Sequence, residues 1–449
     1  MTQIPGHERT ASQARGAAMP SRVFRAILRD EPTGQEGLAN ALAWGFVALG
    51  ILLRVIRLTL NHPIWGDESY LAANLVTRGF AGLTKPLDFA QVAPVAFLWI
   101  EKAFLKILGA NEVALRLFPT ACGIGALLLF RRLCGRLFTG PAVPLAVAFL
   151  SVAFYPIRHG NEAKPYASDL LVAVGLLSIG IAWLRNPSKL RPVWLFAWMA
   201  PAAILLSMPA VFIGGAVGIA WLRKAWKLND RRTWHAIFTV GSTCLAAMAV
   251  SMILIHRTRP DQETLDSLLR DWKHAGAFAP TNPLGWIAWF VRNHTSQMFA
   301  YPVGGANGAS ILTTLCFVSG AVGLWQAGRR ELLALLLLPF LLGMIASMIG
   351  PYPYGASART MQYVAPSICL LSGLGLVELI RFRPGPLRSR HGVALALGAM
   401  AFIGVASLWL DAARPYKTIY ERNARDFADG SGRTWAGTAR SPACTPTSA

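Results

Sequence analysis

The sequence predicts an all-α fold, that of a polytopic integral membrane protein with about 11 transmembrane helices. Apolar runs of about 17–25 residues, the length that a helix needs to cross a bilayer, recur along the whole chain. Only 14% of the 449 residues are charged, against roughly a quarter in soluble domains. The mean hydropathy is +0.43. We therefore expect one membrane domain rather than several soluble domains.

The charge and the cysteines exclude other classes of protein. A formal net charge of +21 is also found in nucleic-acid-binding proteins, but the chain has no recognisable nucleic-acid module and no concentrated basic helix. Basic loops that face the cytoplasm and anionic lipid explain this charge. The six cysteines lack the paired spacing of metal or disulfide sites, which favours small buried hydrophobic residues.

The elements follow one another in a regular order. Residues 1–36 are basic and are expected to form a disordered cytoplasmic tail. The transmembrane domain is predicted at 37–410, and residues 411–449 are expected to be an outer, mostly disordered tail. About eleven segments are predicted to span the membrane: 38–60, 112–130, 141–156, 165–184, 193–206, 211–222, 234–255, 311–325, 332–350, 362–380 and 393–410.

Basic residues set the orientation. Every short loop assigned to the inside carries a cluster of Arg or Lys, which places the N-terminus in the cytoplasm. The two long loops, 61–111 and 256–309, then lie outside. In the first, residues 69–83 and 92–108 are predicted to be helices at the membrane surface. Arg54 and Arg57, near the outer end of the first span, have two interpretations: snorkelling to head groups, or contact with a phosphate.

Asp67 and Glu68 form an acidic pair just beyond the first span. Two carboxylates at a membrane boundary are costly unless they are used. Their predicted role is that of a general base or of ligands for a divalent cation. The alternative is that Asp67 caps a helix beginning at Glu68, with Glu68 in its first turn.

A second polar group spans Arg158 to Tyr166. Pro165 suits the first turn of the inbound helix, so Tyr166 and Asp169 share one face of it. An ionisable residue one turn inside a membrane helix is a functional hypothesis by default. The alternative is a structural salt bridge from Asp169 or Glu162 to Lys164 or Arg158.

Two further groups are weaker candidates. Arg359 and Tyr363 are four residues apart at the outer start of a span, where an Arg suits a phosphate and anchoring at the interface is the alternative. Lys85 and Gln91 lie in the first outer loop, where a solvated Lys is the alternative. The candidate residues for binding a phosphate or another polar part of a substrate are therefore Lys85, Gln91, Arg158, Glu162, Lys164, Tyr166, Asp169, Arg359 and Tyr363.

The order of four short motifs resembles the GT-C membrane glycosyltransferases, in particular the bacterial branch related to protein O-mannosyltransferases and lipid A aminoarabinose transferases. The motifs are Gly66-Asp67-Glu68; Gln91-Val92-Ala93-Pro94 leading into Phe97-Leu98-Trp99; Gly109 with Ala114-Leu115-Arg116-Leu117; and Glu162-Ala163-Lys164-Pro165-Tyr166. The resemblance covers the first half well and the second only in its span layout. Two departures are Pro94-Val95, where many relatives have two prolines, and the lack of a substantial folded C-terminal domain.

The resemblance implies an enzyme of the bacterial inner membrane. It would transfer a hexose- or pentose-type sugar from a polyprenyl-phosphate donor to a lipid, glycan or protein acceptor on the outer face. Asp67 would be the general base or would orient the acceptor, with Glu68 supporting it. Lys164, Lys85 and Arg359 would meet the carrier phosphate. A divalent metal ion at Asp67 and Glu68 stays open.

A transporter or flippase for a lipid-linked glycan or polar solute is the alternative function. Such a protein should carry charges near mid-membrane and internal repeats, whereas the charges here gather at the outer ends of the spans.

Overall fold

The computed structural model describes residues 36–305, 309–350, 352–381, 386–415 and 422–423. This part of the chain is helical and contains no strand. Its helices are α2 (Glu36–Thr59), α3 (Gly66–Thr77), η1 (Gly82–Thr84), α4 (Val95–Leu108), α5 (Glu112–Leu137), α6 (Ala142–Ser151), α7 (Phe154–His159), α8 (Tyr166–Arg185), α9 (Arg191–Leu206), α10 (Ala210–Leu228), α11 (Arg231–Thr258), α12 (Gln262–His274), α13 (Pro283–His294), η2 (Gln297–Phe299), α14 (Ala309–Gln326), α15 (Arg330–Ile349), η3 (Gln362–Val364), α16 (Ala365–Arg381) and α17 (Pro386–Ala413).

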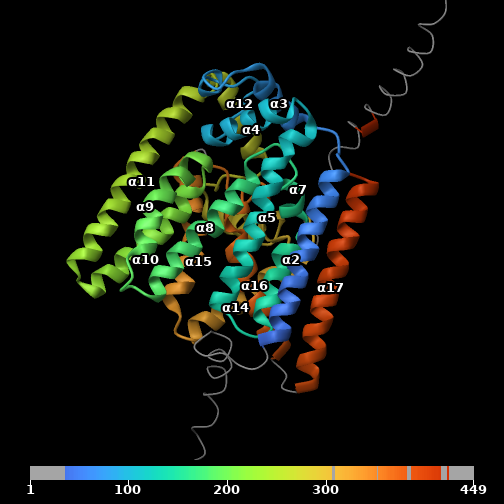
Figure 1. Cartoon of the computed structure of the whole chain (residues 1–449), viewed down its shortest axis with the longest axis vertical. Coiled ribbons are helices and arrows are strands. Elements are labelled where there is room, and N and C mark those ends of the chain that lie inside the picture. Colours follow the sequence, from blue (N-terminus) through green and yellow to red (C-terminus); the bar gives the residue numbers. More distant parts are fainter. Residues whose placement is uncertain (1–35, 306–308, 351, 382–385, 416–421, 424–449) are drawn as a thin grey trace, which may run out of the picture.

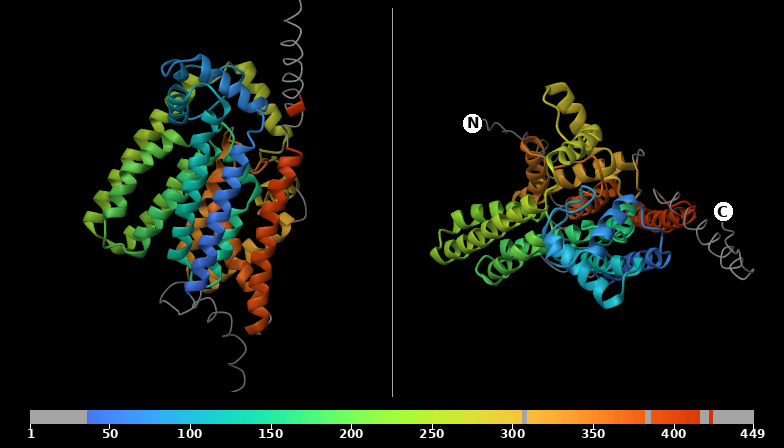
Figure 2. Two further views of the ribbon diagram at one scale, coloured as in Figure 1. Left: turned by 45° about the vertical axis from the view of Figure 1, so that its right-hand side comes forward. Right: turned by 90° about the horizontal axis from the view of Figure 1, so that it is seen from above.

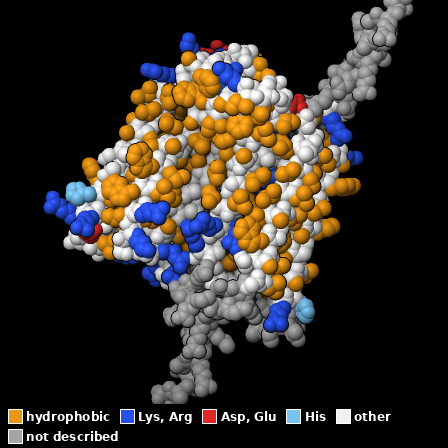
Figure 3. Space-filling model, viewed as in Figure 1, with side chains coloured by type: hydrophobic (Ala, Val, Ile, Leu, Met, Phe, Trp, Pro, Cys, Tyr) orange, Lys and Arg blue, Asp and Glu red, His pale blue; other side chains and the backbone are white. Residues whose placement is uncertain are grey.

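The long helices form a bundle with α3, α4 and α12 lying across one end, which we call the upper end (Figure 1). The centre of the bundle contains α5, α6, α8 and α16. Seen from above, α11 and α17 lie towards opposite edges of the molecule (Figure 2). Apolar side chains cover the middle of the face in Figure 3, as expected for a surface that contacts lipid.

The all-α membrane fold is confirmed. Among the described residues, seven helices are long and apolar enough to cross a membrane, and three shorter apolar helices accompany them: Ala142–Ser151, Arg191–Leu206 and Ser310–Gln326. Each predicted span overlaps a helix. Helix α6 is the shortest of these three apolar helices, and it needs no lipid-facing length because all ten of its residues are buried between neighbours that include α2, α5 and α16.

The first helix of the upper end differs from the prediction. It begins at Gly66 rather than at residue 69, and it ends at Thr77. Trp65 takes the N-cap position with no side-chain cap. The capping role expected of Asp67 is therefore wrong, because Asp67 already lies in the first turn. The predicted segments 1–35 and 424–449 of the two tails lie outside the described residues.

Both interpretations of Arg54 and Arg57 are also wrong, because both side chains are buried inside the protein. Arg54 is fully buried, and its guanidinium donates to the carbonyl oxygens of Gly50 (2.9 Å) and Ser151 (3.1 Å). Arg57 pairs with Asp411 of α17 at 2.9 Å. These arginines therefore connect α2 to α6 and to α17 inside the protein.

The ion pair of Arg57 with Asp411 predicts a large loss of stability when one partner is removed. Both side chains are less than a tenth exposed. Asp411→Ala leaves a buried charge without its partner, so the free energy of unfolding should fall by about 3–5 kcal/mol. Unfolding in detergent measures this, with Asp88→Ala as control because that carboxyl is 59% exposed. A loss no larger than that of the control would contradict the assignment.

Candidate active site

The candidate active site lies at the upper end, where three segments of the chain meet. Asp67 comes from the first turn of α3, Lys164 from the connection between α7 and α8, and Arg359 from the segment before η3. Arg359 donates through Nη1 to Oδ2 of Asp67, and the two form an ion pair. Their side chains are 20% and 31% exposed, so the pair is accessible from outside.

Two tryptophans position the guanidinium of Arg359. Its carbon lies 5.9 Å from the ring centre of Trp65 and 5.4 Å from that of Trp272. Cations over aromatic faces are attracted by the ring quadrupole. Trp65 precedes α3 and Trp272 belongs to α12, so Arg359 joins these two helices at the site.

Lys164 is a buried cation beside this pair. Its Nζ donates to Oε1 of Gln91 at 2.6 Å, and the residue is 7% exposed. Burial, together with the positive charge of Arg359, lowers the pKa of Lys164 to about 8, although the carboxylate of Asp67 opposes this shift. Lys164 can therefore gain or lose its charge at a mildly alkaline pH.

Glu68 points away from Asp67 into the protein. Its Oε1 accepts the backbone N–H of Ala163 at 2.8 Å, and its Oε2 accepts Arg116 of α5 at 3.3 Å. Arg116 also donates to the carbonyl oxygen of His62 at 2.5 Å. Glu68 is 1% exposed. Glu68 therefore ties α3, α5 and the segment carrying Lys164 together.

Arg158 and Glu162 form the salt bridge that was the structural alternative. Arg158 Nε lies 2.9 Å from Glu162 Oε1, and His159 Nδ1 lies 2.8 Å from Glu162 Oε2. Burial would raise the pKa of Glu162, but His159 and Arg158 outweigh it and hold this pKa below its usual range. Both members are 2% exposed, so they support the site from beneath rather than line its open surface.

The other predicted residues are more scattered. Tyr166 is partly buried, with its ring 5.4 Å from that of His159. Asp169 is 6% exposed, and one of its oxygens has no hydrogen-bond partner among the described residues. Tyr363 is buried against Phe212.

Two of the predicted residues do not join the cluster. Tyr363 and Arg359 were expected to lie on one face of a helix because they are four residues apart. Helix α16 begins only at Ala365, so this helical spacing does not apply to the pair. Lys85 is exposed after η1, and no side-chain contact in the described part of the chain joins it to the cluster.

Arg116, His159 and Trp272 were not among the predicted site residues, although Arg116 and His159 lie in segments that the sequence analysis identified. Arg116 is the cation that pairs with Glu68. The sequence feature that could have identified it is its charge near the start of the span predicted at 112–130. Trp272 belongs to α12, an amphipathic helix within the long loop 256–309. Its helical spacing from Leu265 and Leu268 was the available signal.

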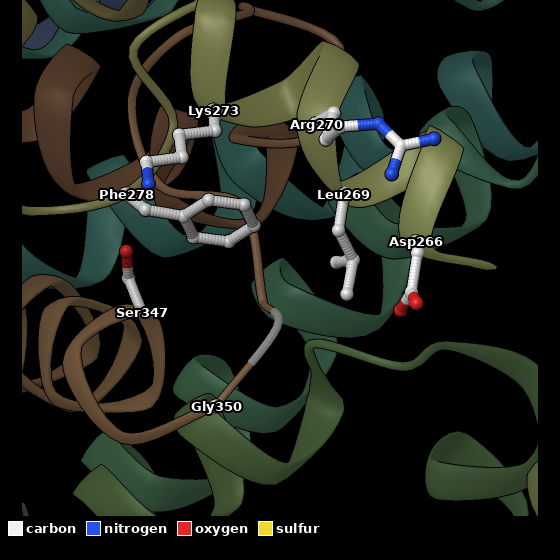
Figure 4. A pocket seen from close by; sticks show the side chains of 7 residues that line it. All are labelled: Asp266, Leu269, Arg270, Lys273, Phe278, Ser347 and Gly350. Carbon is white, nitrogen blue, oxygen red and sulfur yellow. The ribbon is translucent and has the colours of Figure 1, made fainter. Parts of the chain in front are cut away.

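A cavity of about 440 Å³ lies next to α12 (Figure 4). Its lining residues come from α12, from the segment after it and from the end of α15: Asp266, Leu269, Arg270, Lys273, Phe278, Ser347 and Gly350. Trp272, which contacts Arg359, lies on a different face of α12. The cavity is therefore a neighbour of the Asp67 cluster and not part of it.

The carboxylates of Asp67 and Glu68 have separate protein partners. Asp67 pairs with Arg359, whereas both oxygens of Glu68 are bonded inside the protein. The described residues contain no group of three or more His, Cys, Asp or Glu side chains that could hold a metal ion. This donor set does not fit the divalent ion that the sequence left open.

Comparison with solved structures places the fold. No protein-family model and no curated protein sequence matches the chain. The crystal structure of ArnT from Cupriavidus metallidurans in the apo state is similar, with a TM-score of 0.54 and 13% identity over 85% of this chain and 78% of that one. The structure of the same protein bound to undecaprenyl phosphate is also similar, with a TM-score of 0.51 and 12% identity. The match covers 82% of this chain and 77% of that one. The fold expected from the GT-C resemblance is confirmed by this likeness.

The different surroundings of the two adjacent acids predict different mutant phenotypes. Glu68→Gln leaves the buried charge of Arg116 without its counterion and should lower the free energy of unfolding by about 3–5 kcal/mol. Asp67→Asn removes a partly exposed ion pair and should cost about 1 kcal/mol or less. Thermal unfolding of both purified variants measures the difference, and equal losses would refute the assignment.

Proposed function

We propose that the protein is a glycosyltransferase that moves a sugar from a polyprenyl-phosphate donor to an acceptor on the outer face of the bacterial inner membrane. The cluster of Asp67, Arg359 and Lys164 at one end of a membrane bundle carries this proposal. The likeness to ArnT supports it, because one of the ArnT structures contains undecaprenyl phosphate.

The cations suit the leaving group. A phosphate carries negative charge that a guanidinium meets with two parallel hydrogen bonds and an ammonium meets as a point charge. Arg359 and Lys164 supply one of each, both at the end of the membrane helices. The prenyl chain of such a donor would lie in the lipid beside the bundle.

Asp67 suits the acceptor. Its carboxylate would take the proton of an acceptor hydroxyl while that oxygen attacks the anomeric carbon of the sugar. The bond from the anomeric carbon to the phosphate oxygen breaks, and its electron pair leaves with the polyprenyl phosphate. The cations stabilise the charge that develops on this leaving group.

Arg359 links the two halves of the reaction. Without donor, it pairs with Asp67, and this pairing occupies the carboxylate. A donor phosphate competes for the same guanidinium. Donor binding would then release Asp67 for the acceptor proton, so that the base becomes active only when the sugar is present.

The charge distribution supports an outer location of the site. Basic residues lie at the ends of the helices away from α3, α4 and α12 (Figure 1), among them Arg131, Arg132, Arg185 and Arg231. By the positive-inside rule this lower end would face the cytoplasm. The Asp67 cluster would then face the outside, where the lipid-linked donor and the acceptor meet.

The first prediction of this proposal is that Asp67→Asn abolishes sugar transfer. Loss of a general base typically reduces rates by about 10²–10⁴-fold. Each variant is expressed in a deletion strain. Mass spectrometry of the membrane lipids and envelope glycans of that strain then measures sugar transfer. Asp230→Asn is the matched control because this carboxylate caps α11, remote from the site. Normal products with Asp67→Asn, at normal protein level, would contradict the catalytic role.

The second prediction concerns pH. Lys164 holds the phosphate only when protonated, and its pKa is lowered to about 8 by burial. Affinity for the donor should therefore be full below this pH and fall about tenfold for each further pH unit above it. The KM for the donor, measured as a function of pH, tests this predicted loss of affinity. Lys164→Arg keeps its charge throughout and should remove the alkaline loss; an unchanged profile in that variant would exclude Lys164.

A further inference from the structure

A second cavity, of about 500 Å³, lies at the lower end of the bundle. It is bounded by the start of α2, the end of α5 and the connection to α6. Its lining residues are Gly37, Ala39, Asn40, Arg131, Arg132, Gly135, Arg136, Phe138, Thr139, Gly140 and Val143. Neither the fold nor the proposed reaction explains it, because the Asp67 cluster is at the other end.

The lining of this cavity is strongly basic. It contains three arginines within the last two turns of α5, and none of its described lining residues is acidic. Arg185 adds a fourth guanidinium at the rim, where it donates to the carbonyl oxygen of Arg136. Like charges four residues apart on a helix repel each other. A bound anion would remove this repulsion.

The arginines are arranged for an anion. Arg131 is fixed by a hydrogen bond to Asn40 and by stacking over Trp44, 4.6 Å from its ring centre. Arg132 and Arg136 are exposed, and within the described residues no hydrogen bond or ion pair engages their guanidinium groups. Their N–H donors are therefore available, on two adjacent turns of one helix face.

The depth of the cavity indicates the kind of anion. Helices α2 and α5 are both long and apolar enough to span the membrane, and the cavity lies at their ends. Trp44 is 46% exposed in the third turn of α2, a typical position for an aromatic residue at the membrane interface. An anion bound here would lie at the level expected for lipid head groups.

We propose that this cavity binds the phosphodiester head group of an anionic phospholipid. Basic pockets between membrane helices bind such head groups, and guanidinium groups suit phosphate oxygens bidentately. A volume of about 500 Å³ is within the range of ligand sites. The lipid would hold α2 and α5 together at the end remote from the Asp67 cluster. The proposal is independent of the proposed function.

Lipid binding to the purified full-length protein tests this proposal. The thermal midpoint of the protein in detergent is followed during titration with phosphatidylglycerol, with phosphatidylcholine or with inorganic phosphate. Phosphatidylglycerol should raise the midpoint, and the other two should not. The variant with Arg132→Gln and Arg136→Gln should bind phosphatidylglycerol about thirtyfold more weakly, since each basic residue near a membrane contributes about a factor of five.

Two further variants keep the test decisive. Arg231→Gln with Arg232→Gln removes two exposed charges at the lower end of α11, outside the cavity, and should bind like the wild type. Gly135→Phe fills the cavity without removing a charge; among the described residues, the atom nearest to a Cβ there is Arg131 Nη1, at 3.9 Å. It should weaken binding as the double variant does.

Three results would overturn the proposal. The first is that both cavity variants bind phosphatidylglycerol as tightly as the wild type does. The second is that the α11 control loses as much affinity for phosphatidylglycerol as the cavity variants do. The third is that inorganic phosphate raises the thermal midpoint as much as phosphatidylglycerol does, which would indicate a soluble anion.

Discussion

The carboxylate of Glu68 is the constraint on which the candidate site depends. It accepts the N–H of Ala163 and the guanidinium of Arg116, so one buried side chain fixes α3 to α5 and to the segment before α8. A buried carboxylate is stable only when such partners satisfy it. The positions of Asp67, one residue earlier, and Lys164, one residue after Ala163, follow from this connection.

The environment separates the roles of two neighbouring acids. Glu68 is 1% exposed and bonded inside the protein, whereas the side chain of Asp67 is 31% exposed and pairs with Arg359 at the surface of the site. Charges deeper in the protein, such as Glu162 with Arg158, form a supporting layer. The upper end thus combines a rigid buried ionic layer with a few accessible charged groups, an arrangement that suits chemistry on a charged substrate.

Much of this organisation could be predicted from the sequence. Hydrophobic run lengths locate the spans because the bilayer fixes the length of a helix, and unusual charges mark Asp67, Lys164 and Arg359. The partners could not be predicted. Asp67 and Arg359 are 292 residues apart, and the pairing of Arg57 with Asp411 depends on how α2 packs beside α17. Local rules also misplaced the cap of α3 and the position of Tyr363, because helix boundaries are set partly by tertiary contacts.

The central claim is that a polyprenyl phosphate places its phosphate between Lys164 and Arg359. Photo-crosslinking tests it most directly, with a polyprenyl phosphate that carries a diazirine next to the phosphate and with peptide mapping by mass spectrometry. We predict adducts in the peptides that contain Lys164 and Arg359, and competition by unlabelled polyprenyl phosphate. Adducts confined to other peptides, such as those lining the lower cavity, would contradict the claim.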